Sequence, residues 1–125
     1  MSPEFQSAFE SLKAVFAPYI EHLQVLADTP TGYLLHGRVP SPFKQHKGQP
    51  MYFGSVRLGK AYVAFHLMPL YMNEPLTATI SPALKKRMQG KTCFNFKVAP
   101  ELEILEELER LTKDGFACFR GKGWV

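Results

Sequence analysis

The stretch PMYFGSVRLGKAYVAFHLMPLY, residues 50–71, predicts a β-hairpin from which the rest of the fold follows. Apolar and polar residues alternate, and Gly59-Lys60 can form a two-residue turn because glycine supplies the positive φ that a type II′ turn needs. This turn places Phe65 opposite Gly54 on a face that is apolar throughout. Because a slip of one residue would exchange the two faces, the apolar set supports this register and assigns that face to a core.

The other face of the hairpin is mixed and forms the candidate site. The candidate ligand-binding residues are Phe53, Arg57, Tyr62 and His66 of the hairpin, with His36 and Asn95 from strands expected to pack alongside. Aromatic walls with a few polar groups are typical of small-molecule sites. The same face would also suit a homodimer contact, because exposed apolar patches mark either kind of interaction.

A long helix is predicted at each end of the chain. Ser2 and Pro3 match an N-cap and a first helical position, and the apolar stripe that follows should end near Phe16. Pro100 begins a leucine-rich helix, which Gly115 is expected to end. Helices with one apolar stripe must bury it against another element to be stable.

Further strands are predicted on both sides of the turn-rich residues 28–32 and over residues 92–97. We therefore expect an α+β fold, in which an antiparallel sheet of about five strands is covered on one face by the N- and C-terminal helices. The length fits a single domain over residues 1–125. The polar and basic loop 40–49 is long enough to act as a flap over the open face, or it is a plain connection.

Composition and charge limit the class of protein. Hydrophobic content of 46% and charged content of 21% are ordinary for a globular chain. No apolar run approaches the roughly 18 residues of a membrane span, and the N-terminus does not resemble a secretory signal, so we expect a cytoplasmic protein without a membrane partner. The net charge of +4 comes without a nucleic-acid-binding motif, which argues against a nucleic-acid partner.

Residues that bind metals or carry out catalysis do not form a known motif. Cys93 and Cys118 are far apart in sequence, and the four histidines show no metal-ligand spacing, so neither a metal site nor a cofactor is predicted. His66 is the best candidate for a general acid or base, because histidine titrates near neutrality. No nucleophile can be placed beside it from the sequence.

The run YVAFHLMPLYMNE, followed by ISPALKKRMQGKTCFNFK and a Pro-initiated leucine helix, resembles the YdhG-like family of small bacterial domains of unknown function. The resemblance covers residues 51–115 and rests on their pattern rather than on a catalytic motif. It implies an antiparallel sheet backed by helices, similar to the frataxin arrangement. Because some relatives are described as iron chaperones, it also implies an iron or metal chaperone as one function, although no metal ligand is carried over to this chain.

Three functions therefore remain open. The first is a non-enzymatic binding module that holds a small ligand on the open sheet face. The second is the frataxin-like metal chaperone that the resemblance implies. The third is an enzyme that uses His66 as an acid or base, and it has the least support because no partner residue is visible.

Overall fold

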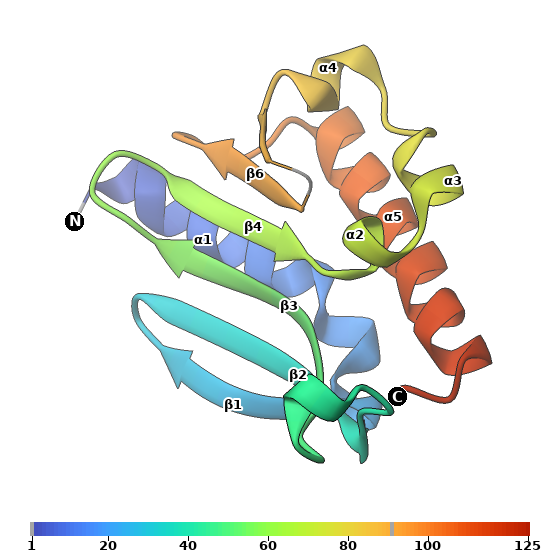
Figure 1. Ribbon diagram of the computed structural model, residues 1–125. Helices are drawn as coiled ribbons and strands as arrows, with labels where there is room; N and C mark the ends of the chain where they lie inside the picture. Colours follow the sequence, from blue (N-terminus) through green and yellow to red (C-terminus); the bar gives the residue numbers. More distant parts are fainter. Residues whose placement is uncertain (1, 91) are drawn as a thin grey trace.

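The computed structural model describes residues 2–90 and 92–125, which form a six-stranded antiparallel sheet in the order β1-β2-β3-β4-β6-β5. The strands are β1 Gln24–Thr29, β2 Gly32–Pro40, β3 Pro50–Leu58, β4 Val63–Leu67, β5 Met88–Gln89 and β6 Cys93–Phe96. The helices are α1 Pro3–Val15, α2 Pro69–Met72, α3 Glu74–Thr77, α4 Pro82–Lys85 and α5 Leu102–Gly121, with 3-10 turns η1 Ala17–His22 and η2 Lys44–His46. Helix α1 lies behind the sheet and α5 runs beside it, next to α2, α3 and α4, while the other face of the sheet is open (Figure 1). The predicted α+β class is confirmed, and the two-residue β5 adds a strand at one edge.

Helix α1 forms as the sequence predicts. The Ser2 hydroxyl accepts a hydrogen bond from the backbone N–H of Phe5 at 3.1 Å, so it caps the first turn next to Pro3. The helix ends at Val15, and Phe16 is its C-cap. Its apolar stripe is buried against the sheet, which accounts for most of the stability that such a short helix can have.

The sequence predicts that the last helix ends at Gly115. Helix α5 instead continues to Gly121. Gly115 is a buried residue inside the helix, and a Cβ added to it would lie 2.7 Å from the Cβ of Pro69. The glycine therefore allows α5 to pass close to the start of α2. Beyond the helix, Trp124 packs on Phe119 with ring centroids 5.1 Å apart, so the end of the chain folds back onto the body.

The hairpin of β3 and β4 has a loop two residues longer than predicted. Leu58 pairs with Val63, and the N–H of Gly59 donates to the carbonyl of Tyr62 at 2.9 Å. A displacement of two residues keeps both faces as predicted between Gly54 and the loop, because side chains alternate with a period of two. It does move the pairs, so Gly54 lies opposite Leu67 rather than Phe65.

Gly54 makes room for Phe16 and for the backbone of β4, since an added Cβ would also lie 2.8 Å from the carbonyl oxygen of His66. A Cβ at this position would lie 2.7 Å from Cζ of Phe16, at the end of α1. The Phe16 ring stacks on that of Phe65 with centroids 5.0 Å apart. The close contact between α1 and the sheet is therefore made where β3 has no side chain.

A β-bulge in β3 changes the placement of one predicted site residue. Leu35 pairs with Gly54, but the next residue of β2, His36, pairs with Tyr52, so Phe53 is the extra residue of the bulge. Phe53 is fully buried and packs in the core, with its ring 5.8 Å from that of Phe119. The prediction that Phe53 lies on the open face is therefore wrong, because it assumed strict alternation through a strand that is interrupted.

Candidate functional site

Four of the predicted site residues lie near the hairpin loop, at one end of the open sheet face. Arg57, Tyr62 and His66 line a depression of about 700 Å³ next to that loop. Asn95 is close by, since its amide and the Tyr62 hydroxyl both donate to the side-chain oxygen of Gln89, at 2.7 and 3.3 Å. This region, which we call the hairpin end, is lined by charged and polar side chains together with the small apolar side chains of Ala61 and Ala64.

His66 has the surroundings of a neutral imidazole at the hairpin end. Its cross-strand neighbours are Ser55 on β3 and Cys93 on β6, which the sequence alone could not place. Partial burial lowers the pKa of His66, and the positive charge of Arg57 lowers it further. The histidine is therefore able to accept a proton at neutral pH.

Neither neighbour is arranged as a nucleophile. Burial raises the pKa of the Cys93 thiol, which donates to the side-chain oxygen of Asn95 at 3.4 Å. The Ser55 hydroxyl is bonded to that of Tyr52 at 2.6 Å. Among the residues that the structure describes, neither group hydrogen-bonds to His66, so a nucleophile–base pair is not assembled.

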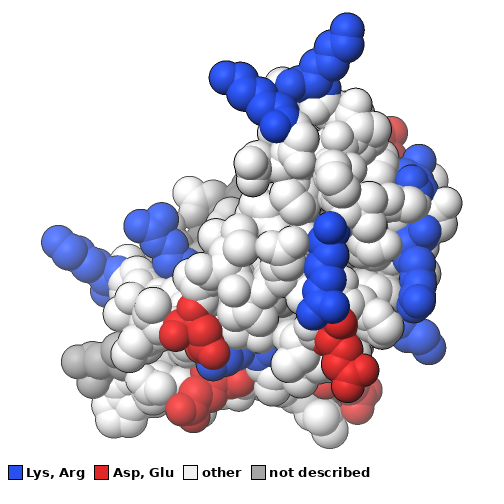
Figure 2. Space-filling view, turned by 90° about the horizontal axis from the view of Figure 1, so that it is seen from below, with Lys and Arg blue, Asp and Glu red and all other residues white. Residues whose placement is uncertain are grey.

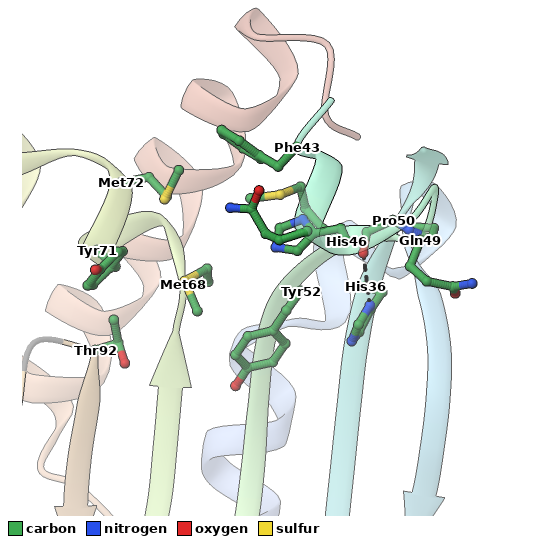
Figure 3. Close-up of a pocket in the computed structure, with 12 residues that line it drawn as sticks. His36, Phe43, His46, Gln49, Pro50, Tyr52, Met68, Tyr71, Met72 and Thr92 are labelled. Atoms are coloured by element: carbon green, nitrogen blue, oxygen red, sulfur yellow. Dashed lines mark hydrogen bonds between the residues drawn. The ribbon is translucent and has the colours of Figure 1, made fainter. Parts of the chain in front are cut away.

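A second pocket, of about 500 Å³, lies at the opposite end of the open face. It is formed by β2, β3, the loop 41–49 and the start of α2 (Figure 3). Its apolar walls are made by Phe43, Met51, Tyr52, Met68, Tyr71 and Met72. Its polar groups include His36, His46 and Thr92. We call this region the pocket end.

Tyr52 enters the pocket because of the bulge. Its ring packs beside that of His36, with centroids 5.7 Å apart. Burial raises the pKa of the Tyr52 phenol to about 12, although the hydrogen bond with Ser55 acts in the opposite direction. The phenol therefore stays protonated at neutral pH and forms a neutral wall of the pocket.

The loop 41–49 is held in place over the pocket. Its ends are joined by a hydrogen bond from the N–H of Ser41 to the carbonyl of Gln49 at 3.0 Å. The buried Ser41 hydroxyl bonds to Nδ1 of His46 at 2.6 Å and accepts from the N–H of Phe43 at 3.1 Å. Phe43 also packs on the ring of Trp124, with centroids 5.6 Å apart. The basic loop that the sequence singled out is thus a wall of the pocket.

The structure therefore divides the predicted set of residues. His36 lies at the pocket end, Arg57, Tyr62, His66 and Asn95 lie at the hairpin end, and Phe53 lies in the core. Sequence reasoning missed the walls made by Phe43, Tyr52 and Met72. The one local signal was the aromatic and methionine content of residues 68–72, which the sequence analysis did not use.

The described part of the chain has neither a cluster of metal-ligating side chains nor a membrane-spanning helix. No three or more His, Cys, Asp or Glu side chains in residues 2–90 and 92–125 are grouped so that they could hold a metal ion. Nor does any described helix have the length and apolarity needed to cross a bilayer. On the face seen in Figure 2, Lys and Arg side chains lie next to one another at the top and along the right edge, and acidic side chains lie mostly below them.

Comparison of the chain with protein-family models, curated proteins and solved structures gives no match. The geometry of the open face is therefore the basis for a functional interpretation.

Proposed function

We propose that the protein is a binding module for a small, mainly apolar ligand with a flat aromatic body, held at the pocket end. The observation that carries this proposal is the pocket of about 500 Å³ between Tyr52, the loop 41–49 and the start of α2. Small-molecule sites typically have volumes of about 300–1,000 Å³, apolar walls and a few convergent polar groups. The depression at the hairpin end has a larger volume, but Arg57 and Lys60 line it and it has no comparable apolar wall.

The side chains of the pocket suit an aromatic ligand. Tyr52 and Phe43 present rings, while Met68 and Met72 lie across from Tyr52 near α2 (Figure 3). Methionine sulfur makes favourable contacts with the edges of aromatic rings, worth about 0.3–1.5 kcal/mol each. Methionine is also unbranched and adaptable, so these two side chains can close on a flat ring without moving the backbone.

The charges around the pocket favour a neutral or anionic ligand. None of the described residues that line it is an Asp or a Glu. Lys44 and Lys47, both exposed on the loop 41–49, form no salt bridge with another described residue. Glu74, which begins α3 just beyond Met72, is exposed. An ammonium group would therefore find no counter-charge in the pocket and would lose its hydration on entry.

The methionine methyl groups provide a direct test. Met51, Met68 and Met72 line the pocket, whereas Met88 lies in β5 and does not. Protein labelled with ¹³C at the methionine methyls is titrated with benzofuran, a flat apolar bicycle, and followed by NMR. We expect saturable shifts of the Met51, Met68 and Met72 signals with the Met88 signal unchanged. No shift, or a shift of Met88 alone, would contradict the proposal.

A matched pair of variants tests the same site by affinity. Met72→Glu puts a carboxylate into the apolar pocket and should weaken benzofuran binding at least about tenfold, which corresponds to about 1.4 kcal/mol. Met88→Glu makes the same change at a methionine that is also half-buried but lies outside the pocket, and it should leave the affinity unchanged. Equal affinities for the two variants would count against the pocket end as the binding site.

A further inference from the structure

The hydrogen bond made by His36 fixes which of its ring nitrogens carries the proton. Nδ1 of His36 lies 3.3 Å from the carbonyl oxygen of Pro50. A carbonyl oxygen can only accept, so Nδ1 must be the donor. In a neutral imidazole with the proton on Nδ1, Nε2 has a free lone pair and is a hydrogen-bond acceptor. It lies on the far side of the ring from Pro50 (Figure 3).

The surroundings of His36 hold this ring in one orientation. Pro50 begins β3 and pairs with Pro40 at the end of β2, so its carbonyl is part of the sheet. The Tyr52 ring packs against the imidazole at a tilt of 50°. His36 itself is half-buried and lines the pocket. The acceptor nitrogen is therefore positioned before any ligand arrives.

His46, the other histidine of the pocket, lacks this constraint. Its Nδ1 is bonded to the Ser41 hydroxyl, which is able to donate or to accept. The bond therefore does not decide which nitrogen of His46 is protonated. Of the two pocket histidines, His36 is the one whose hydrogen-bonding role the structure determines.

We infer that His36 determines ligand specificity by accepting, at Nε2, a hydrogen bond from an N–H or O–H group on the ligand's aromatic body. The inference rests on the proposed function and narrows the ligand class to flat aromatic molecules with such a donor, of the indole or phenol type. A ligand of the same shape without the donor leaves the acceptor unpaired in a partly desolvated site, which lowers its affinity.

A thermodynamic cycle isolates this hydrogen bond. Indole and benzofuran have nearly the same shape, but indole has an N–H where benzofuran has an oxygen. Their dissociation constants are measured by calorimetry on the unmodified protein and on His36→Phe, which keeps a ring but has no acceptor. The preference for indole over benzofuran should fall about fivefold in the variant, as expected for the loss of one neutral hydrogen bond. The control His22→Phe replaces a histidine outside the pocket and should leave the preference unchanged.

The Nε2 resonance of His36 gives a second readout that needs no variant. In long-range ¹H–¹⁵N spectra of the unmodified protein, indole should shift this resonance and benzofuran should leave it in place. An unresponsive Nε2, or an unchanged indole preference in folded His36→Phe, overturns the inference. If both ligands still shift the methyls of Met51, Met68 and Met72, the proposed function stands without it. If neither ligand shifts them, the proposed function itself fails.

Discussion

The two ends of the open sheet face share the same strands but differ in shape and chemistry. At the hairpin end, β3 and β4 alternate regularly, and the depression there is lined by Arg57, Tyr62 and His66. At the pocket end, the bulge in β3 and the loop 41–49 give the surface a wall on one side, and α2 gives it a wall on the other. The pocket with apolar walls therefore arises where the regular pattern of the sheet is interrupted.

The largest expected effect tests the bulge itself. Phe53→Ala should lower the free energy of unfolding by about 3–5 kcal/mol, because it removes a fully buried ring from the core. Chemical denaturation followed by circular dichroism measures this loss. Tyr62→Ala, at the exposed hairpin end, should cost less than about 1 kcal/mol. Similar, small losses for both variants would mean that Phe53 is not in the core and that the strand has no bulge.

The next effect separates the two ends. In Gly115→Val the new side chain meets Pro69, which should push α2 away from α5 and cost about 1–3 kcal/mol in stability. Because α2 is a wall of the pocket, the affinity for benzofuran should fall. The NMR chemical shifts of methyl groups and aromatic rings at the hairpin end should stay unchanged. Gly121→Ala is the control, since nothing lies within 4 Å of its added Cβ. A stable Gly115→Val with unchanged binding would argue against this wall.

A smaller effect concerns the loop 41–49. Ser41→Ala removes the hydroxyl that bonds to His46 and Phe43, and it should cost about 1 kcal/mol. Because Phe43 packs on Trp124, the only tryptophan of the chain, a loosened loop should change the tryptophan emission. Thr31→Ala, a substitution in the turn between β1 and β2, is a control that should leave the emission unchanged. An unaltered spectrum for Ser41→Ala would show that the hydroxyl does not hold the loop.

The smallest effect is the pH dependence set by His66. Its pKa in the folded protein lies below the ordinary value of 6.5, so below neutrality the folded state binds fewer protons than the unfolded state. The folded state is stabilised most above pH 6.5, where His66 is neutral in both the folded and the unfolded state. This stabilisation is lost as the pH falls through 6.5 toward the pKa that His66 has in the folded protein. His66→Gln should therefore lose less stability than the unmodified protein between pH 7 and pH 5.

An NMR titration checks the cause of this shift. In Arg57→Gln, the midpoint of the His66 ring signals should move up toward 6.5, because a nearby positive charge has been removed. A midpoint at or above 6.5 in the unmodified protein would contradict the burial of His66.

The fold could be predicted from the sequence wherever one periodicity holds over a whole element. The stripe of α1, the part of the hairpin from Gly54 to Leu67 and the short strand β6 all have such a pattern. Phe53 could not be placed, because a bulge depends on what packs against the strand rather than on its own residues. Its neighbours in sequence alone make Gly115 a predicted helix end. In the fold it instead lets α5 pass close to Pro69, which is remote in sequence.

The site was less predictable than the fold for a related reason. The pocket combines three segments, the loop 41–49, the bulged part of β3 and the start of α2. No sequence periodicity links them. His36 was identified as a candidate because it is a histidine beside the hairpin, but its partner Pro50 and its tautomer follow from the register of β2 with β3.

The most direct test of the difference between the two ends is the position of a bound aromatic ligand. Isotope-filtered nuclear Overhauser spectra of labelled protein with unlabelled indole report which side chains lie next to the ligand. We expect contacts from indole to the methyl groups of Met68 and Met72 and to the ring of Tyr52. Contacts to Tyr62 and His66 instead would place the site at the hairpin end and contradict it.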